Sequence, residues 1–317
     1  MRILYIAGLG RSGSTVLDQI LGAQPGAFSV GQFLDVWKHG VLENWRCACG
    51  DSFASCAFWS KVRTSDPGLL TREAAADVQH YHEQTFRLRF MYRLWWEGGR
   101  RGILAKTPPS YFDRISRLYR AVRSVSGCET IVDSSKSPGY AHLLIESGVA
   151  DQVELIHIVR DPRAVAYSSM RRRVDPTSPD SSIAIEPHSV TLTAAMWVEW
   201  NTTIERLAQQ YPVRYTLLRY EDFVKDPGVT LTRLGLTSGV AASDSTSFSL
   251  TYPEWHTVYG NPSRLRSGPI VLREDNEWRE KMPSGAATAV SVITAPLLTR
   301  YGYRAHVRVG GGASSNT

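Results

Sequence analysis

Eight residues near the N-terminus, GLGRSGST, have the composition of a binding site for phosphate or sulfate. They follow a short apolar run and precede an amphipathic stretch, so backbone N–H groups and a helix N-terminus would surround one point. Arg11 offers a planar fork of donors to phosphate or sulfate oxygens, and neighbouring hydroxyls add further donors. The residues that we expect to bind the anion are Gly10, Arg11, Ser12, Gly13, Ser14 and Thr15.

Two common nucleotide-binding loops match this segment only in part. The glycines at positions 8, 10 and 13 satisfy the dinucleotide pattern G-x-G-x-x-G, but that pattern needs an acid about 20 residues further on. Between Asp18 and Asp35 the chain has no Asp or Glu. The ATP-binding loop needs a lysine where this chain has Ser14. A plain glycine-rich turn without a ligand also fits the loop when it is taken alone.

A second candidate phosphate site follows the apolar run Val153–Val159. Arg160 ends that run, Pro162 suits the first turn of a helix, and Ser168 falls about two turns later. Arg160 and Ser168 could therefore reach one phosphate together. Two separate phosphate sites would fit a nucleotide that is phosphorylated at both its 5′ and its 3′ position.

The elements that must position these residues alternate along the chain, which predicts an α/β fold with a central, mostly parallel sheet flanked by helices. We expect one domain over residues 1–308 and a disordered tail over 309–317. The polar segment 172–187 has little to bury and is expected to be a mobile loop. The expected strands are Ile3–Ala7, Thr130–Asp133, Val153–Val159 and Val213–Leu218. The expected helices are Ser14–Gly22, Thr71–Trp96, Ser110–Val125, Ser189–Gln210 and Gly285–Tyr301.

In these motifs the chain resembles the sulfotransferase superfamily, especially its bacterial members and the tyrosylprotein branch. The loop GLGRSGSTVL is similar to that family's 5′-phosphosulfate loop, and IVRDPRAVAYSS is similar to its 3′-phosphate motif. Three further segments agree in the same order: VDSSKSP, LLRYEDFVKDP and GNPSRLRSGPIVLREDNEWREK. The resemblance implies a P-loop-like fold and the donor 3′-phosphoadenosine 5′-phosphosulfate, with Lys136 as the catalytic lysine. It further implies that Tyr220, Ser263 and Arg264 contact the nucleotide.

The activity implied by the resemblance is transfer of a sulfuryl group to a hydroxyl of a small-molecule or carbohydrate acceptor. Such a transfer needs positioning and charge stabilisation and requires no metal, and Arg11 and Lys136 are the candidate cations. The acceptor also needs a base. Many relatives supply it from a Gly-Glu pair, but this chain has Gly31-Gln32 there, and the histidine used by cytosolic relatives is also missing.

Three explanations of the missing base stay open. Another carboxylate substitutes, such as Glu43 or Asp35, which follows Gln32 by about one helical turn. Alternatively, the acceptor is an acidic phenol, or the protein binds the nucleotide without turning it over. A kinase or NTPase of the P-loop type is the further alternative.

Three of the four cysteines lie close together in the segment CACGDSFASC, as Cys47, Cys49 and Cys56. The spacing C-x-C-x6-C brings three thiols into one loop, but the common C-x2-C zinc knuckle is absent. No fourth ligand is obvious, although His39 lies nearby. We therefore favour a disulfide or a reduced thiol cluster over zinc.

Composition sets broad limits on the function. The 317 residues are 43% hydrophobic and 21% charged, which is typical of a globular protein. A net charge of +6 is a mild excess that does not by itself imply nucleic acid. No apolar run reaches the roughly 18 residues of a membrane span. We expect a cytoplasmic protein without a membrane segment, and the sequence leaves its oligomeric state open.

Overall fold

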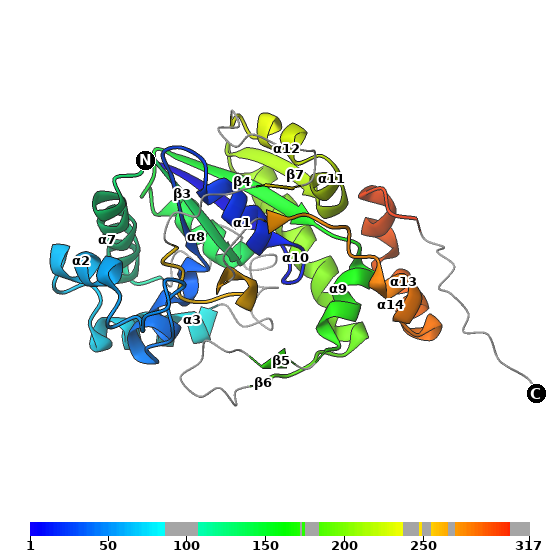
Figure 1. Cartoon of the computed structure of the whole chain (residues 1–317), viewed down its shortest axis with the longest axis horizontal. Coiled ribbons are helices and arrows are strands. Elements are labelled where there is room, and N and C mark those ends of the chain that lie inside the picture. The colour runs from blue at the N-terminus through cyan, green and yellow to red at the C-terminus, as the bar shows by residue number, and fades with distance from the viewer. Residues whose placement is uncertain are drawn as a thin grey trace, which may run out of the picture.

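A parallel five-stranded sheet forms the centre of the molecule (Figure 1). The computed structural model describes residues 1–85, 107–171, 173–174, 184–236, 247–248, 255–265 and 270–304. The strands lie in the order β2-β3-β1-β4-β7, and every neighbouring pair is parallel. Their bounds are β1 Arg2–Ala7, β2 Ala27–Gly31, β3 Thr130–Lys136, β4 Gln152–Val159 and β7 Arg214–Arg219. The predicted α/β fold with a parallel sheet is thus confirmed.

Helices cover both faces of the sheet, which explains why the central strand β1 is buried from Ile3 to Ala7. Tyr5 packs into a core with side chains of α7, α8 and α10, whereas Leu4 and Ile6 pack with side chains of α1, α11 and α12. The bounds on the first face are α7 Pro109–Ser126, α8 Pro138–Glu146 and α10 Val190–Gln210. Those on the second are α1 Ser14–Gly22, α11 Tyr220–Lys225 and α12 Pro227–Arg233.

Two further groups of helices lie at opposite ends of the molecule in Figure 1. At one end are α2 (Ala57–Ser65) and α3 (Arg72–Thr85), near α7. At the other end are α9 (Pro162–Ser169), α13 (Glu277–Lys281) and α14 (Ser284–Arg300). Short elements complete the described chain: η1 Phe33–Asp35, the π-helix η2 Val36–Leu42, η3 Pro262–Leu265, and the two-stranded pairs β5 Arg173–Val174 with β6 Ala184–Ile185 and β8 Ser247–Phe248 with β9 Ile270–Val271.

The predicted elements agree with this arrangement. All four expected strands are present, and β2 is an additional strand at the sheet edge. The helix expected over Thr71–Trp96 is described as far as Thr85, and its remainder lies outside the described residues. Of the loop 172–187 the structure describes β5, β6 and the residues after β6, and the tail 309–317 lies outside the described residues. Among the described helices none is long and apolar enough to cross a membrane.

The direction of the strands decides where the site lies. Because all five strands are parallel, the segments that follow them emerge at one edge of the sheet. The glycine-rich loop follows β1, Gln32 follows β2, Lys136 ends β3, Arg160 follows β4 and Tyr220 follows β7. Five motifs that are far apart in the sequence therefore meet at this edge.

Candidate active site

A cleft of about 550 Å³ opens at the carboxyl edge of the sheet. Its volume is within the usual range for small-molecule sites, about 300–1,000 Å³. Most of the residues expected to bind the nucleotide or to take part in catalysis line this cleft: Gly10, Arg11, Gly13, Ser14, Thr15, Lys136, Arg160, Ser168, Tyr220 and Ser263. Gln32 also lines it.

The glycine-rich loop ends at Gly13, which is the N-cap of helix α1 and has the left-handed φ of 88°. A side chain at this position would also collide with a neighbour, because a Cβ on Gly13 would lie 2.4 Å from the Tyr220 ring. The loop thus approaches the ring more closely than any residue with a side chain allows. Glycine is required here both by the backbone conformation and by the contact.

Replacing Gly13 with alanine is expected to weaken nucleotide binding at least tenfold, because the loop must move away from Tyr220. Isothermal titration with 3′,5′-diphosphoadenosine measures the effect. Gly26→Ala is a matched control, since Gly26 also has a left-handed φ, 73°, but has no atom within 4 Å of an added Cβ. That variant should lose only the backbone strain, about 1–2 kcal/mol of stability. Equal nucleotide affinity in both variants would contradict the prediction.

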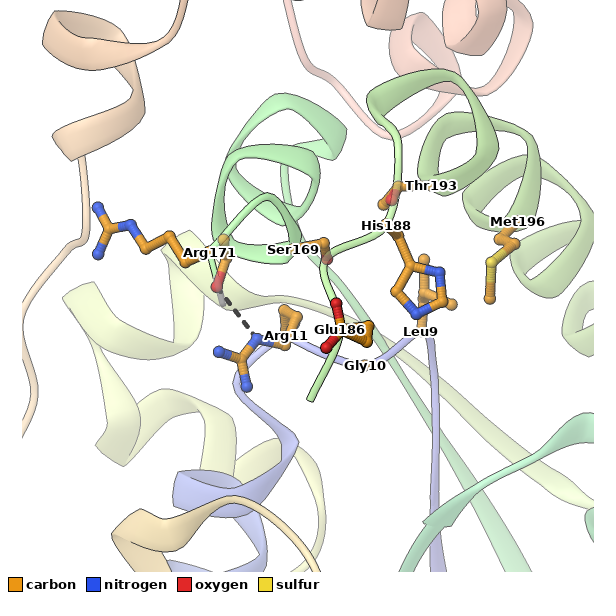
Figure 2. Close-up of a pocket in the computed structure, with 10 residues that line it drawn as sticks. Leu9, Gly10, Arg11, Ser169, Arg171, Glu186, His188, Thr193 and Met196 are labelled. Atoms are coloured by element: carbon orange, nitrogen blue, oxygen red, sulfur yellow. Dashed lines mark hydrogen bonds between the residues drawn. The ribbon is translucent and has the colours of Figure 1, made fainter. Parts of the chain in front are cut away.

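The two candidate phosphate sites are joined through Arg11. Its Nε donates a hydrogen bond to Ser168 Oγ at 3.1 Å (Figure 2). Arg160 Nη1 donates in turn to the carbonyl oxygen of Arg11 at 3.0 Å. The Arg160 guanidinium also lies over the Tyr220 ring, 4.6 Å from its centroid. The residues of both motifs therefore form one continuous cationic site.

Asp275 is a member of this site that the sequence did not point to. Its carboxylate accepts a hydrogen bond from Arg160 Nη2 at 3.0 Å, and the residue also lines the cleft. The side chain of Arg160 is almost completely buried, whereas that of Asp275 is half exposed. The carboxylate thus takes up one of the N–H donors of the Arg160 guanidinium. Since 115 residues separate the two, no local pattern in the sequence could have revealed the pair.

Lys136 lies among three carboxylates, those of Asp18, Asp35 and Asp133. Burial lowers the pKa of Lys136 to about 8, and of the three acids Asp35 opposes this shift most strongly. Lys136 also has a left-handed backbone, with φ 67°, and its Nζ donates to the Ser134 carbonyl at 3.2 Å. A partly desolvated cation is thus held at the carboxyl end of β3, the neighbour of the central strand β1.

The three carboxylates differ in what they bind. Asp133 accepts hydrogen bonds from the Ser135 backbone and hydroxyl and from the Tyr119 hydroxyl. Asp18 accepts one from the Ser29 hydroxyl at 2.6 Å. Within the described ranges, the Asp35 carboxylate accepts none.

The position of Asp35 is nevertheless defined. Its backbone N–H donates to the Gln32 carbonyl at 3.1 Å, so Gln32 and Asp35 do lie one helical turn apart, as expected. Asp35 does not line the cleft, but it is close enough to Lys136 to raise the pKa of that lysine. Burial raises the pKa of Asp35 to about 6, although Lys136 and Lys38 act against the shift. A carboxyl with this pKa is mostly ionised at neutral pH and is able to accept a proton.

Some candidates lie outside the cleft wall. Ser12, within the glycine-rich loop, is buried and does not line the cleft. Arg264 is also buried, and its guanidinium donates to the carbonyl oxygens of Thr257, Val258 and Arg46. Arg264 therefore fixes the backbone of the segment 257–264. Other residues of that segment, Tyr259, Gly260, Asn261, Pro262 and Ser263, form the wall itself.

Glu43, His39 and His157 take part in other contacts. Glu43 Oε2 lies 2.8 Å from His39 Nδ1, and the His39 ring stacks on Tyr259. His157 is buried in β4 between the Tyr215 hydroxyl and the Asn201 side chain, each at 2.8 Å. Burial lowers the pKa of His157 to about 4. These contacts give His39 and His157 structural roles.

A smaller pocket of about 190 Å³ adjoins the cleft and is shown in Figure 2. It shares Gly10, Arg11 and Ser168 with the cleft. Apolar groups from Leu9 and Met196 line it together with polar groups that include Glu186 and His188. A molecule in this pocket would lie next to the Arg11 side chain.

Comparison with known proteins gives a consistent result. The model of the sulfotransferase family matches residues 4–244. Among solved structures, the chain is similar to the sulfotransferase domain of the Synechococcus PCC 7002 olefin synthase, with 22% identity, coverage of 96% of this chain and 95% of that chain, and a TM-score of 0.50. It is also similar to the sulfotransferase domain from the curacin biosynthetic pathway, with 17% identity, coverage of 95% and 97%, and a TM-score of 0.49. Curated proteins give no significant match.

Proposed function

Since the chain belongs to the sulfotransferase family, we propose that it transfers a sulfuryl group from 3′-phosphoadenosine 5′-phosphosulfate to a hydroxyl of a small-molecule or carbohydrate acceptor. The observation that supports this donor best is the junction of the two phosphate sites. Arg11 contacts Ser168 through its side chain and Arg160 through its carbonyl, so one ligand with two phosphates would bind both motifs. A nucleotide phosphorylated at the 5′ position alone would leave half of the site unused.

In this proposal each end of the donor has its own partners. The 5′-phosphosulfate binds at the N-terminus of α1, where Ser14 and Thr15 line the cleft. The 3′-phosphate binds Arg160 and Ser168 and replaces the carboxylate of Asp275 on Arg160. Tyr220 and Ser263 contact the nucleotide between the two ends.

The transfer itself is an in-line displacement at sulfur. A bond forms between the acceptor oxygen and sulfur while the bond between sulfur and the 5′-phosphate oxygen breaks, and negative charge develops on that leaving oxygen. Lys136 and Arg11, which both line the cleft, stabilise this charge. The acceptor proton passes to a base, and we assign that role to Asp35, whose pKa is raised to about 6 by burial.

The pocket of Figure 2 is the proposed site for the part of the acceptor that lies away from the reacting hydroxyl, because the pocket shares Arg11 with the nucleotide cleft but includes neither Lys136 nor Asp35. Its volume of about 190 Å³ suits a small ring or a short chain and not a large polymer segment. A structure of the protein with 3′,5′-diphosphoadenosine and an acceptor tests the assignment. An acceptor bound entirely outside the pocket would contradict it.

The donor is tested by nucleotide selectivity. Without magnesium, 3′,5′-diphosphoadenosine should bind at least tenfold more tightly than AMP, ADP or ATP. The Arg160→Ala variant should lose roughly 10- to 100-fold in affinity for it, the value of one charge-assisted hydrogen bond. Arg120→Ala is a suitable control, because Arg120 is exposed on α7. Preference for ATP with magnesium would instead favour a kinase or NTPase.

The transfer is tested separately by incubating the enzyme and donor with a cell extract and searching by mass spectrometry for products that gain a sulfuryl group. Such products support the proposal, and their identity gives the acceptor class. Tight binding of the diphosphate without any transfer would favour a nucleotide-binding protein that has lost the activity.

A further inference from the structure

Three cysteines and one histidine lie together about the loop 46–56, outside the residues that line the nucleotide cleft. The ligand atoms of Cys47, Cys49, Cys56 and His256 are all within 4.8 Å of one another. The sequence had favoured a disulfide or a metal-free thiol cluster because a fourth ligand was lacking. The fold supplies that ligand as His256, which follows Cys56 by 200 residues, and all four cysteines of the chain are free.

The separations of these atoms are those of ligands around one small ion. With Zn–S bonds of about 2.3 Å and Zn–N bonds of about 2.0 Å, tetrahedral geometry places two sulfurs about 3.8 Å apart and a sulfur and a nitrogen about 3.5 Å apart. The sulfurs of Cys49 and Cys56 are 3.6 Å apart. His256 Nδ1 lies 3.3 Å from the Cys56 sulfur and 3.9 Å from the Cys47 sulfur.

Backbone hydrogen bonds shape the chain around the cysteines. Arg46 and Ser52 pair as an antiparallel bridge, so the chain turns back on itself between them. Within this turn the Cys47 N–H donates to the Asp51 carbonyl at 2.7 Å, and the Gly50 N–H donates to the Cys47 carbonyl at 3.0 Å. Gly50 has a left-handed φ of 100°, which a turn of this kind requires.

His256 is fixed from several sides as well. Its ring stacks on Phe58, with centroids 4.8 Å apart and planes inclined by 8°. Its carbonyl accepts a hydrogen bond from Trp59 Nε1 at 2.8 Å, and the next carbonyl, of Thr257, accepts one from the Ala48 N–H at 2.9 Å. These contacts orient Nδ1 toward the sulfurs, as a preformed ligand site needs.

We propose that Cys47, Cys49, Cys56 and His256 bind one structural Zn²⁺ ion. Three sulfurs and one imidazole nitrogen in tetrahedral arrangement are the ligands that zinc prefers, and four protein ligands leave no open position for catalysis. Cys47 and Cys56 are buried, while Cys49 is exposed and gives the ion access from solvent. The ion takes no direct part in the proposed transfer, because its four ligands lie outside the residues that line the nucleotide cleft.

The site has a consequence for the nucleotide cleft. His256 lies three residues before Tyr259, which begins the stretch of cleft wall that ends at Ser263. Binding of zinc therefore ties this wall to the cysteine loop and, through Trp59 and Phe58, to helix α2. Loss of the ion should loosen the wall and weaken nucleotide binding.

The first experiment measures metal in the whole protein purified with a reductant and without a chelator. Elemental analysis should find one zinc ion per chain, and thiol modification with a mercurial should release it. Substitution of cobalt(II) should give the visible absorption of a tetrahedral, thiolate-ligated ion. Protein that holds no zinc and does not bind added zinc or cobalt(II), whether with four free thiols or with a Cys49–Cys56 disulfide, overturns the proposal.

The second experiment uses variants. Cys49→Ser and His256→Ala should lower the zinc content to well below half of the wild-type value, and His256→Cys should retain it because a thiolate replaces the imidazole. Cys128→Ser is the matched control, since Cys128 is a buried cysteine outside the cluster. Full zinc content in both Cys49→Ser and His256→Ala overturns the assignment of ligands. If these variants do not fold, the measurements on the wild type decide.

Discussion

Turnover should fall at least 10²-fold when Lys136 is replaced by methionine, the magnitude found when one group that stabilises developing charge is removed. Methionine keeps the length and the apolar stem of the side chain, so the loss of the charge is isolated from the loss of packing. The left-handed backbone at position 136 is equally strained for lysine and methionine, so the stability should change little for that reason. Initial rates at saturating donor and the affinity for 3′,5′-diphosphoadenosine should be measured in parallel.

The prediction requires that the rate falls much more than the affinity, because the charge develops only in the transition state. Lys136→Arg should recover part of the rate, since it restores a cation. Lys61→Met serves as a control, because Lys61 is exposed on helix α2. A Lys136→Met enzyme with the wild-type rate would exclude Lys136 from the chemistry.

Asp35→Asn should lower turnover by roughly 10²- to 10⁴-fold, the range typical of a lost general base. Asparagine is isosteric with aspartate but does not accept a proton at neutral pH. Asp35 is the candidate because, within the part of the chain that the structure describes, its carboxylate accepts no hydrogen bond, whereas Asp18 and Asp133 each accept at least one. Glu43→Gln should keep the wild-type rate, because Glu43 pairs with His39.

The pH dependence gives a sharper test of Asp35. The base must be deprotonated, and its pKa is raised to about 6, so kcat/KM should rise with pH through about 6. Lys136 must be protonated, and burial lowers its pKa to about 8, so kcat/KM should fall above about 8. The two limbs report apparent values of the coupled cluster and not of isolated groups.

Asp35→Asn should change both limbs. The acidic limb should disappear with the base, and the alkaline limb should move to lower pH, because Asp35 is the strongest of the charges that raise the pKa of Lys136. An unchanged profile with a merely reduced rate would assign the base elsewhere. If the profile is unchanged, the Gln32→Glu variant, which places a carboxylate in the cleft, should raise the rate when removal of the acceptor proton limits turnover.

The fold could be predicted well because patterns of neighbouring residues in the sequence mark most of its strands and helices. Each of the four expected strands is a short apolar run rich in β-branched residues, and each is present in the sheet. The strand β2, with the sequence AFSVG, lacks that signal because it is short and contains small residues. It forms a strand because β3 provides a parallel partner at the sheet edge, which is a property of the whole fold.

The same distinction applies to the candidate site. That Arg11, Lys136 and Arg160 lie together in one cleft could be predicted, because each stands in a motif that ends or follows a strand. The pairing of Asp275 with Arg160 and the contact of His256 with the cysteines could not, because both join segments more than 100 residues apart. Arg264, which the family resemblance places at the nucleotide, donates to backbone carbonyls in this structure, and its contact with the nucleotide stays a prediction.

The strand order determines how the candidate active site responds to insertions in the surrounding loops. Arg11, Lys136 and Arg160 follow or end β1, β3 and β4, which are immediate neighbours in the sheet. Adjacent strands lie about 4.8 Å apart because backbone hydrogen bonds fix that distance. The sheet therefore fixes the distances between the backbone segments that carry the three cationic side chains. Insertions in the peripheral loops would alter which molecules enter the cleft, while the sheet keeps the backbone segments that carry the three cations at the same spacing.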